Sequence, residues 1–174
     1  MPPASETALL VDATRAGDRA AFGRLYALHA PLVHGVLLAR VRRADADDLV
    51  QEVFLTALRR LASLREPAAF GPWVAAIARN RASDFVRRSP RGEELPDDLP
   101  GATDVEGSAE AALALAAIRG LPDAYRETLV LRLVEGLTGP EIAERTGLSP
   151  GSVRVNLHRG MKLLRGRLGL EDKA

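Results

Sequence analysis

The fold of this chain is decided by residues 135–154, which read E-G-L-T-G-P-E-I-A-E-R-T-G-L-S-P-G-S-V-R. Thr138 is a suitable N-cap for a short helix, and the sequence Gly147-Leu148-Ser149 predicts a tight turn after it. Ser149 can cap a second helix with Pro150 at its first position, where the missing N–H of proline has no helical partner to lose. Two short helices joined by a three-residue turn containing glycine are typical of a helix-turn-helix.

The second helix of this pair carries a local excess of positive charge. Residues 150–170 contain no acid, and they include Asn156, His158 and five cations: Arg154, Arg159, Lys162, Arg165 and Arg167. Cations bind phosphates, and amide and guanidinium groups can read base edges in the major groove. The turn, the cap and the charge together favour DNA binding. A helical hairpin with a solvated basic face is the alternative.

The rest of the chain is also predicted to be helical, because its apolar residues recur every three to four positions. In the N-terminal half, Gly17 interrupts a first helix, and Pro31 is expected to begin a new one. Asp45 is expected to cap a third helix, and Pro67 opens a fourth. Two more helices precede the helix-turn-helix. No stretch of comparable length alternates apolar and polar residues, so the predicted fold class is all-α.

Charge and composition divide the chain into two predicted domains. The net charge of the whole chain is only +1, but residues 91–120 hold 2 basic and 7 acidic side chains. This stretch overlaps a segment rich in proline and glycine with little apolar periodicity, which is typical of a linker. The predicted division is an N-terminal helical domain over 1–88, a flexible acidic linker over 89–108 and a helix-turn-helix domain over 109–174. A long surface loop within one domain is the alternative.

Several classes of function find no support in the sequence. The chain has no cysteine, which excludes disulfides, thiolate zinc sites and cysteine catalysis and is compatible with a reducing cytoplasm. The three histidines, His29, His34 and His158, lack metal-ligand spacing, and no phosphate-binding glycine loop is present. No apolar run is long enough to cross a membrane, and no secretory signal begins the chain. We therefore expect a cytoplasmic protein that is not an enzyme, with no cofactor, no bound metal and no membrane insertion.

Five motifs in order make the chain resemble the ECF (extracytoplasmic function) sigma factors, the small group of the bacterial sigma-70 family. The motifs lie at 17–26 (G-D-R-A-A-F-G-R-L-Y), 45–55 (D-A-D-D-L-V-Q-E-V-F-L), 70–84 (F-G-P-W-V-A-A-I-A-R-N-R-A-S-D), 121–132 (L-P-D-A-Y-R-E-T-L-V-L-R) and 135–154. The resemblance implies that the N-terminal domain is similar to sigma region 2 and the C-terminal domain to sigma region 4. It also implies an alternative sigma factor that directs promoter-specific transcription initiation.

The resemblance implies two binding surfaces in the N-terminal domain. The helix at 45–64 matches the element that holds the β′ subunit of core RNA polymerase, with Asp48, Gln51, Glu52 and Leu55 as its contact face. The loop and helix after it match the element that engages the single-stranded −10 DNA, where a flipped base needs stacking and hydrogen bonds. The candidate −10 residues are Arg65, Phe70, Trp73, Arg79, Asn80, Arg87 and Arg88. For Phe70 and Trp73, a place in the core is an equally good interpretation.

The C-terminal domain is expected to bind the −35 element through its second helix. The candidate residues are Ser152, Arg154, Val155, Asn156, His158, Arg159 and Lys162. Ser152 stands where the family often has threonine, and Val155 stands where relatives are often polar, so no −35 sequence preference follows from the resemblance.

The partners that the resemblance implies are core RNA polymerase, through its β and β′ subunits, promoter DNA, and an anti-sigma protein that buries the polymerase-binding faces. A stand-alone helix-turn-helix regulator is the alternative function. Such a regulator binds its site alone, whereas a sigma factor needs core polymerase for tight, specific binding.

Overall fold

Helices account for all regular secondary structure in the part of the chain that the computed structural model describes, residues 3–89 and 107–170. The all-α prediction is confirmed. The N-terminal part contains α1 (Pro3–Arg15), α2 (Arg19–Leu38), α3 (Arg43–Arg60) and α4 (Phe70–Arg88), with short 3-10 turns at Leu61–Ser63 and Pro67–Ala69. The C-terminal part contains α5 (Gly107–Arg119), α6 (Asp123–Leu133), α7 (Gly139–Thr146) and α8 (Pro150–Arg167). Nearly all of the predicted linker, residues 90–106, lies outside the described residues.

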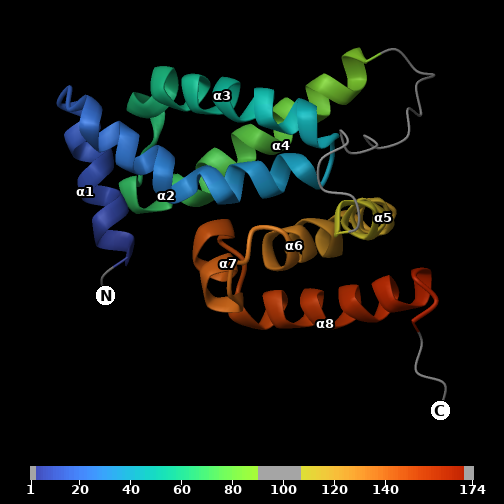
Figure 1. Ribbon diagram of the computed structural model, residues 1–174. Helices are drawn as coiled ribbons and strands as arrows, with labels where there is room; N and C mark the ends of the chain where they lie inside the picture. Colours follow the sequence, from blue (N-terminus) through green and yellow to red (C-terminus); the bar gives the residue numbers. More distant parts are fainter. Residues whose placement is uncertain (1–2, 90–106, 171–174) are drawn as a thin grey trace.

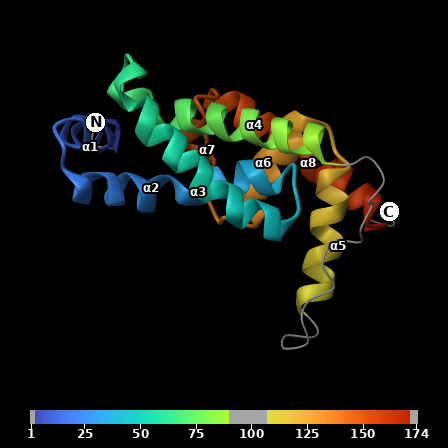
Figure 2. The same ribbon diagram turned by 90° about the horizontal axis from the view of Figure 1, so that it is seen from above.

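The helices form two layers that pack on each other (Figure 1). Helices α1 to α4 make the upper layer, and α6, α7 and α8 lie beneath it, with α2 in contact with α6 and α4 in contact with α7. Helix α5 runs across one end of the molecule, as the view from above shows (Figure 2). Buried side chains from both layers belong to one continuous core, which includes Leu25 and Phe70 above and Leu129 and Ile142 below.

Helix α2 is enclosed on almost every side in its second half. Every residue from 32 to 39 except His34 is buried. A helix that is apolar all round belongs inside a protein rather than at its surface. Here α1, α3 and α4 cover α2 from within the N-terminal part, and α6 covers it from the C-terminal part. Helix α2 is therefore the element through which the two parts are joined.

Two local predictions are wrong. Pro31 does not begin a helix but lies inside α2, although proline removes a backbone donor there. One turn before it, the Leu28 carbonyl accepts a hydrogen bond from Arg145 Nη1 of α7 at 3.3 Å, so tertiary contacts support the helix at this point. Asp45 is not the cap of α3, which begins at Arg43; instead Asp45 accepts a hydrogen bond from Arg42 Nε at 3.1 Å.

The helix-turn-helix predictions are confirmed in detail. Thr138 and Glu141 form a reciprocal capping box at the start of α7. Gly147 ends α7 with a φ of 76°, in the left-handed region that glycine enters without strain. Ser149 then caps α8 by accepting a hydrogen bond from the backbone N–H of Ser152 at 3.1 Å. Residues 138–152 therefore fix both helix ends and the turn between them.

Candidate nucleic-acid interface

Helix α8 packs against α6 through one buried face and presents most of its polar side chains to solvent. Val153, Gly160 and Leu164 are buried. A Cβ at Gly160 would lie 3.0 Å from Leu129 Cδ1, so α8 lies very close to α6 at that point. The exposed candidates are Ser152, Arg154, Val155, His158, Arg159 and Lys162, while Asn156 is half-buried. The structure thus places six of the seven predicted −35 residues on the surface.

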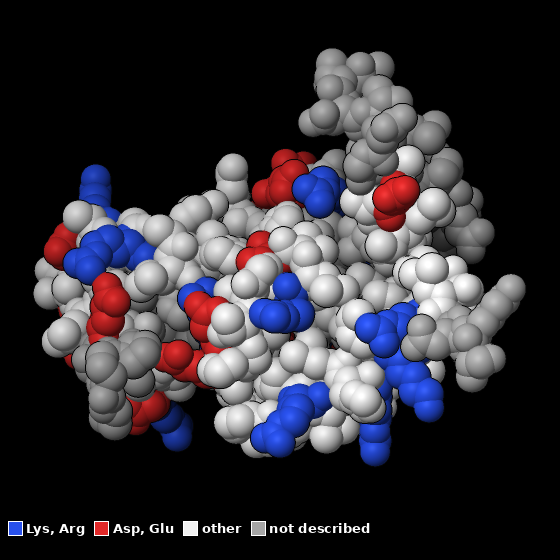
Figure 3. All heavy atoms as spheres, turned by 60° about the horizontal axis from the view of Figure 1, so that its bottom comes forward, with Lys and Arg blue, Asp and Glu red and all other residues white. Residues whose placement is uncertain are grey.

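The candidates on α8 occupy two adjoining strips. Ser152, Val155, Arg159 and Lys162 follow one another at helical spacing and form the centre of the exposed face. Arg154 and His158 are four residues apart and form one edge of it. Figure 3 shows basic side chains spread over the lower face of the molecule, which α8 forms. A row of cations without acids suits a polyanion such as DNA.

The predicted −10 residues do not all lie together. Trp73 is half-buried and Asn80 is exposed, and their seven-residue spacing places both on one face of α4. Phe70 is fully buried, with its ring centroid 5.0 Å from that of His29 and 5.8 Å from that of Trp73. Arg65 in the preceding loop is exposed. Phe70 is therefore a core residue in this structure, and Trp73 and Asn80 are the accessible pair.

The remaining basic candidates on α4 differ in their surroundings. Arg87 and Arg88 are exposed in the last turn, where Arg87 pairs with Asp84. Arg79 lies instead on the side of α4 that faces the C-terminal part. Its Nε and Nη2 donate to the two carboxylate oxygens of Glu127 at 3.0 and 2.7 Å. The cation that the sequence assigned to DNA is thus already paired.

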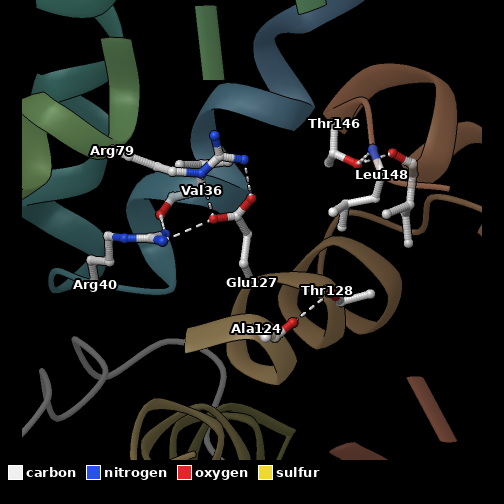
Figure 4. A network of polar contacts seen from close by, with 9 residues as sticks. Val36, Arg40, Arg79, Ala124, Glu127, Thr128, Thr146 and Leu148 are labelled. Carbon is white, nitrogen blue, oxygen red and sulfur yellow. Dashed lines mark hydrogen bonds and ion pairs between the residues drawn. The ribbon is translucent and has the colours of Figure 1, made fainter. Parts of the chain in front are cut away.

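Glu127 of α6 binds a second arginine as well (Figure 4). Arg40, which follows α2, pairs with Glu127 Oε2 at 2.9 Å and also donates to the Val36 carbonyl. Only 8% of Glu127 is exposed. Burial acts to raise the pKa of this carboxyl, but the hydrogen bonds and charges of Arg79 and Arg40 outweigh it and lower the pKa overall. The carboxylate is therefore ionised and held between two guanidinium groups.

Sequence reasoning missed Glu127 and Arg40. A buried acid is unusual unless it is paired, and nothing near residue 127 in the sequence names its partners. The available signal was the run from Leu32 to Ala39, which is apolar except for His34 and must be covered from two sides.

The face predicted to hold polymerase is a continuous exposed strip of α3. Asp48, Gln51, Glu52 and Leu55 are all exposed, and Leu55 is exposed by 52% although it is apolar. Glu52 pairs with Arg81 of α4, whose Nε lies 2.7 Å from Glu52 Oε2. Beside the strip, a groove of about 400 Å³ runs between α3 and α4. Leu58, one turn further along α3, is also exposed, by 43%, so this side of the helix combines apolar area with acids and an amide.

Within residues 3–89 and 107–170, no cluster of three or more His, Asp or Glu side chains could hold a metal ion. No helix in the described ranges is both long enough and apolar enough to cross a membrane.

These features define a helical protein of the DNA-binding class, with a helix-turn-helix in one part and a candidate protein-binding strip in the other. Two family models match the chain: sigma-70 region 2 over residues 25–92 and sigma-70 region 4 over residues 111–164. The chain belongs to the sigma-70 family of RNA polymerase sigma factors, in its ECF group. It is therefore a factor for promoter-specific transcription initiation, and a stand-alone regulator is not favoured.

Curated relatives match along most of the chain. RNA polymerase sigma factor CarQ of Myxococcus xanthus is 36% identical, over 89% of this chain and 93% of the relative. ECF RNA polymerase sigma factor BldN of Streptomyces coelicolor is 35% identical, over 89% of this chain and 63% of the relative. ECF RNA polymerase sigma-E factor of Haemophilus influenzae is 30% identical, over 91% of this chain and 93% of the relative.

A solved structure shares the fold. CnrH, in complex with the cytosolic domain of CnrY, superposes with a TM-score of 0.66 over 96% of this chain and 99% of that chain, at 23% identity.

Proposed function

We propose that the chain has two functional domains, at 1–88 and 109–174, joined by a linker at 89–108. The N-terminal domain binds core polymerase and the −10 element, and the C-terminal domain binds the −35 element. The observation that carries this proposal is the pair of exposed surfaces on α3 and α8, one acidic and amphipathic, the other basic and free of acids. Surfaces of opposite charge suit different partners: a protein for the first and DNA for the second.

On α3, the proposed contact with the polymerase β′ subunit consists of Asp48, Gln51, Glu52 and Leu55. All four are exposed, and they recur at the spacing of one helix face. The leucine supplies apolar area, and the acids and the amide supply hydrogen bonds and orientation.

On α4, Trp73 and Asn80 are proposed to receive an unstacked −10 base, with Arg65, Arg87 and Arg88 binding phosphates around it. An indole offers a stacking surface, and an amide offers both a donor and an acceptor. Phe70 packs against Trp73 from the core. Arg79 becomes available to DNA only when its contact with Glu127 is broken.

On α8, the proposed −35 contacts are the exposed strips described above, with Arg154 reading bases and Lys162 binding phosphate. The N-terminal end of such a helix enters the major groove, and the C-terminal end rises towards the backbone. The chain needs no metal or cofactor for this function. A protein that covers the polymerase-binding faces, an anti-sigma factor, is the proposed regulatory partner.

Run-off transcription with core RNA polymerase on fragments of the source genome tests this proposal. We expect defined transcripts that require both the chain and the core enzyme, and no tight promoter binding by the chain alone. Specific duplex binding without polymerase, together with no transcript, would instead support a stand-alone regulator.

A further inference from the structure

We infer that the two parts of the chain form a closed state in which the Glu127 carboxylate occupies the guanidinium group that Arg79 would otherwise offer to promoter DNA. The inference rests on the proposed function in one respect, the role of Arg79 in binding −10 DNA. It gives the contact between Glu127 and Arg79 a role in limiting DNA binding, which the sigma factor function itself does not require.

The geometry of the contact is that of an anion-binding fork. Arg79 Nε donates to Glu127 Oε2 at 3.0 Å, and Arg79 Nη2 donates to Glu127 Oε1 at 2.7 Å. Arginine binds carboxylate and phosphate with the same two parallel N–H groups. Glu127 therefore competes directly with a DNA phosphate for the same donors. Arg40 pairs with the same carboxylate at 2.9 Å, so two guanidinium groups share one negative charge.

The contact surface around Glu127 is closely fitted. A Cβ on Gly35 of α2 would lie 2.6 Å from Leu131 Cδ2 and 3.0 Å from Glu135 Cγ, and one on Gly71 of α4 would lie 2.9 Å from the carbonyl oxygen of Arg145. All three facing residues belong to the C-terminal part. Glycine at both positions lets α6 and α7 approach more closely than any other residue would allow.

Further polar contacts cross the same surface. Arg119 Nε donates to the Leu38 carbonyl at 3.2 Å, at the C-terminal end of α2, and Arg145 donates to the Leu28 carbonyl. Cations suit the carbonyl end of a helix. The contacts between the parts are thus distributed along α2 from Leu28 to Leu38 and are not confined to one ion pair.

The ionic contact at the centre of this surface can exchange partners, although apolar side chains of both parts pack around it. Burying an ion pair costs desolvation energy that largely offsets the attraction, so its separation into water is close to balanced. DNA phosphates can then replace the carboxylate. The strip on α3 lies in the upper layer, away from α6 to α8, so the closed state leaves the proposed polymerase contact uncovered (Figure 1).

One matched pair of variants and one charge-removing variant test the inference. Gly35→Gln places a long side chain where Leu131 now lies, whereas Gly23→Gln in the same helix meets nothing within 4 Å of the new Cβ. Glu127→Gln keeps the shape of the side chain and removes its charge. Because the chain has no cysteine, spin labels can be attached at Ala62→Cys and Arg165→Cys, one in each part. Double electron–electron resonance then measures the distance between the two labels.

We expect a narrow distance distribution for the wild type and for Gly23→Gln, and a broad one extending to longer distances for Gly35→Gln and Glu127→Gln. Anisotropy of a fluorescein-labelled oligothymidylate measures DNA binding by the same proteins without polymerase. If about one wild-type molecule in ten is open, full opening tightens this binding about tenfold. Circular dichroism melts establish that each variant folds. If Gly35→Gln does not fold, Glu127→Gln still tests the inference.

A broad distribution in the wild type would overturn the closed state, and unchanged distances in Gly35→Gln and Glu127→Gln would overturn the role of these two residues in maintaining it. Longer distances with unchanged oligothymidylate affinity would overturn the competition between Glu127 and DNA. Loss of polymerase-dependent transcription from all four proteins would refute the proposed function instead, because the distance measurement does not involve polymerase.

Discussion

The two helices proposed to touch promoter DNA, α4 and α8, differ in what their cations do in the free protein. On α8, Arg154, Arg159 and Lys162 are exposed in a helix without acids. On α4, Arg79 is bound by a carboxylate from the other part of the chain. The cations of a basic helix can therefore be exposed to a ligand or already paired within the protein, and composition alone does not distinguish the two cases.

The aromatic and apolar candidates on α4 and α8 also differ, and the largest effect on stability is expected at one of them. Phe70 is fully buried whereas Val155 on α8 is 44% exposed. We expect Phe70→Ala to lower the free energy of unfolding by about 3–5 kcal/mol, because it leaves a large cavity. Val155→Ala should change it by about 0.5 kcal/mol or less. Urea denaturation measures both, and a loss below about 1 kcal/mol for Phe70→Ala would mean that Phe70 is not a core residue.

Histidines provide a second test of the difference between the parts. Burial, with a smaller contribution from the charge of Arg145, lowers the pKa of His29 from 6.5 to about 4. The unfolded chain then binds a proton that the folded chain does not, so stability is present above pH 6.5 and is lost as the pH falls towards 4. The loss over this window is about 3 kcal/mol. We expect the pH dependence of unfolding to weaken in His29→Leu and to persist in His158→Ala, which changes an exposed residue of α8.

The pKa of His34 shifts in the opposite direction, and its protonation reports on the closed state. It pairs with Glu135 of the C-terminal part, and its Nε2 lies 3.3 Å from Asp47 Oδ1. The hydrogen bond to Glu135 and both carboxylate charges raise its pKa, against burial and the charge of Arg43. Because the folded pKa lies above 6.5, this stabilisation is complete at lower pH and is lost as the pH rises through the raised pKa. We expect the spin-label distances of the wild type to broaden over that range, and those of His34→Gln to show no such transition.

On α8, the two strips should differ in specificity. We expect Arg154→Ala to cost about 1–3 kcal/mol on the preferred promoter and to relax preference at one or two base pairs. Lys162→Ala should weaken all sequences alike and lower the slope of log affinity against log salt by about one. Transcription from a panel of single-base −35 variants measures the sequence preference, and binding at several salt concentrations measures the slope. A uniform loss for Arg154→Ala would make it a phosphate contact and assign base reading to Asn156, His158 or Arg159.

The smallest effect on stability is expected on α3. The exchange of both Gln51 and Glu52 for alanine should change the free energy of unfolding by about 0.5 kcal/mol or less, because both side chains are exposed. The Glu52–Arg81 pair adds little, since solvent screens it. Binding to core polymerase, measured by co-purification or anisotropy, should nevertheless fall. Loss of the fold would contradict the assignment of this face.

Local chemistry made the C-terminal part largely predictable. Thr138, Gly147 and Ser149 fix helix ends through bonds within a few residues, so their roles can be inferred from the sequence. Pro31 and Asp45 show where such rules fail, because tertiary contacts maintain α2 through a proline and α3 begins two residues before its expected cap. Local preferences give way when packing favours another arrangement.

The candidate site was predictable where it lies on one helix and not where it joins two. The exposed strips on α3 and α8 follow from helical spacing. Phe70 and Trp73 fit both core and surface in sequence, and only packing separates them. Glu127 could not be assigned to Arg79 because 48 residues separate the two in the chain.

Gly35 gives the molecule a point of graded adjustment. A single methyl group at this position would meet Leu131, so a series from glycine through alanine to larger side chains would set the fraction of open molecules stepwise. In a synthetic gene circuit, such a series would give factors with the same promoter but different thresholds of expression. The volume of one side chain would then set the level of transcription, with the promoter sequence unchanged.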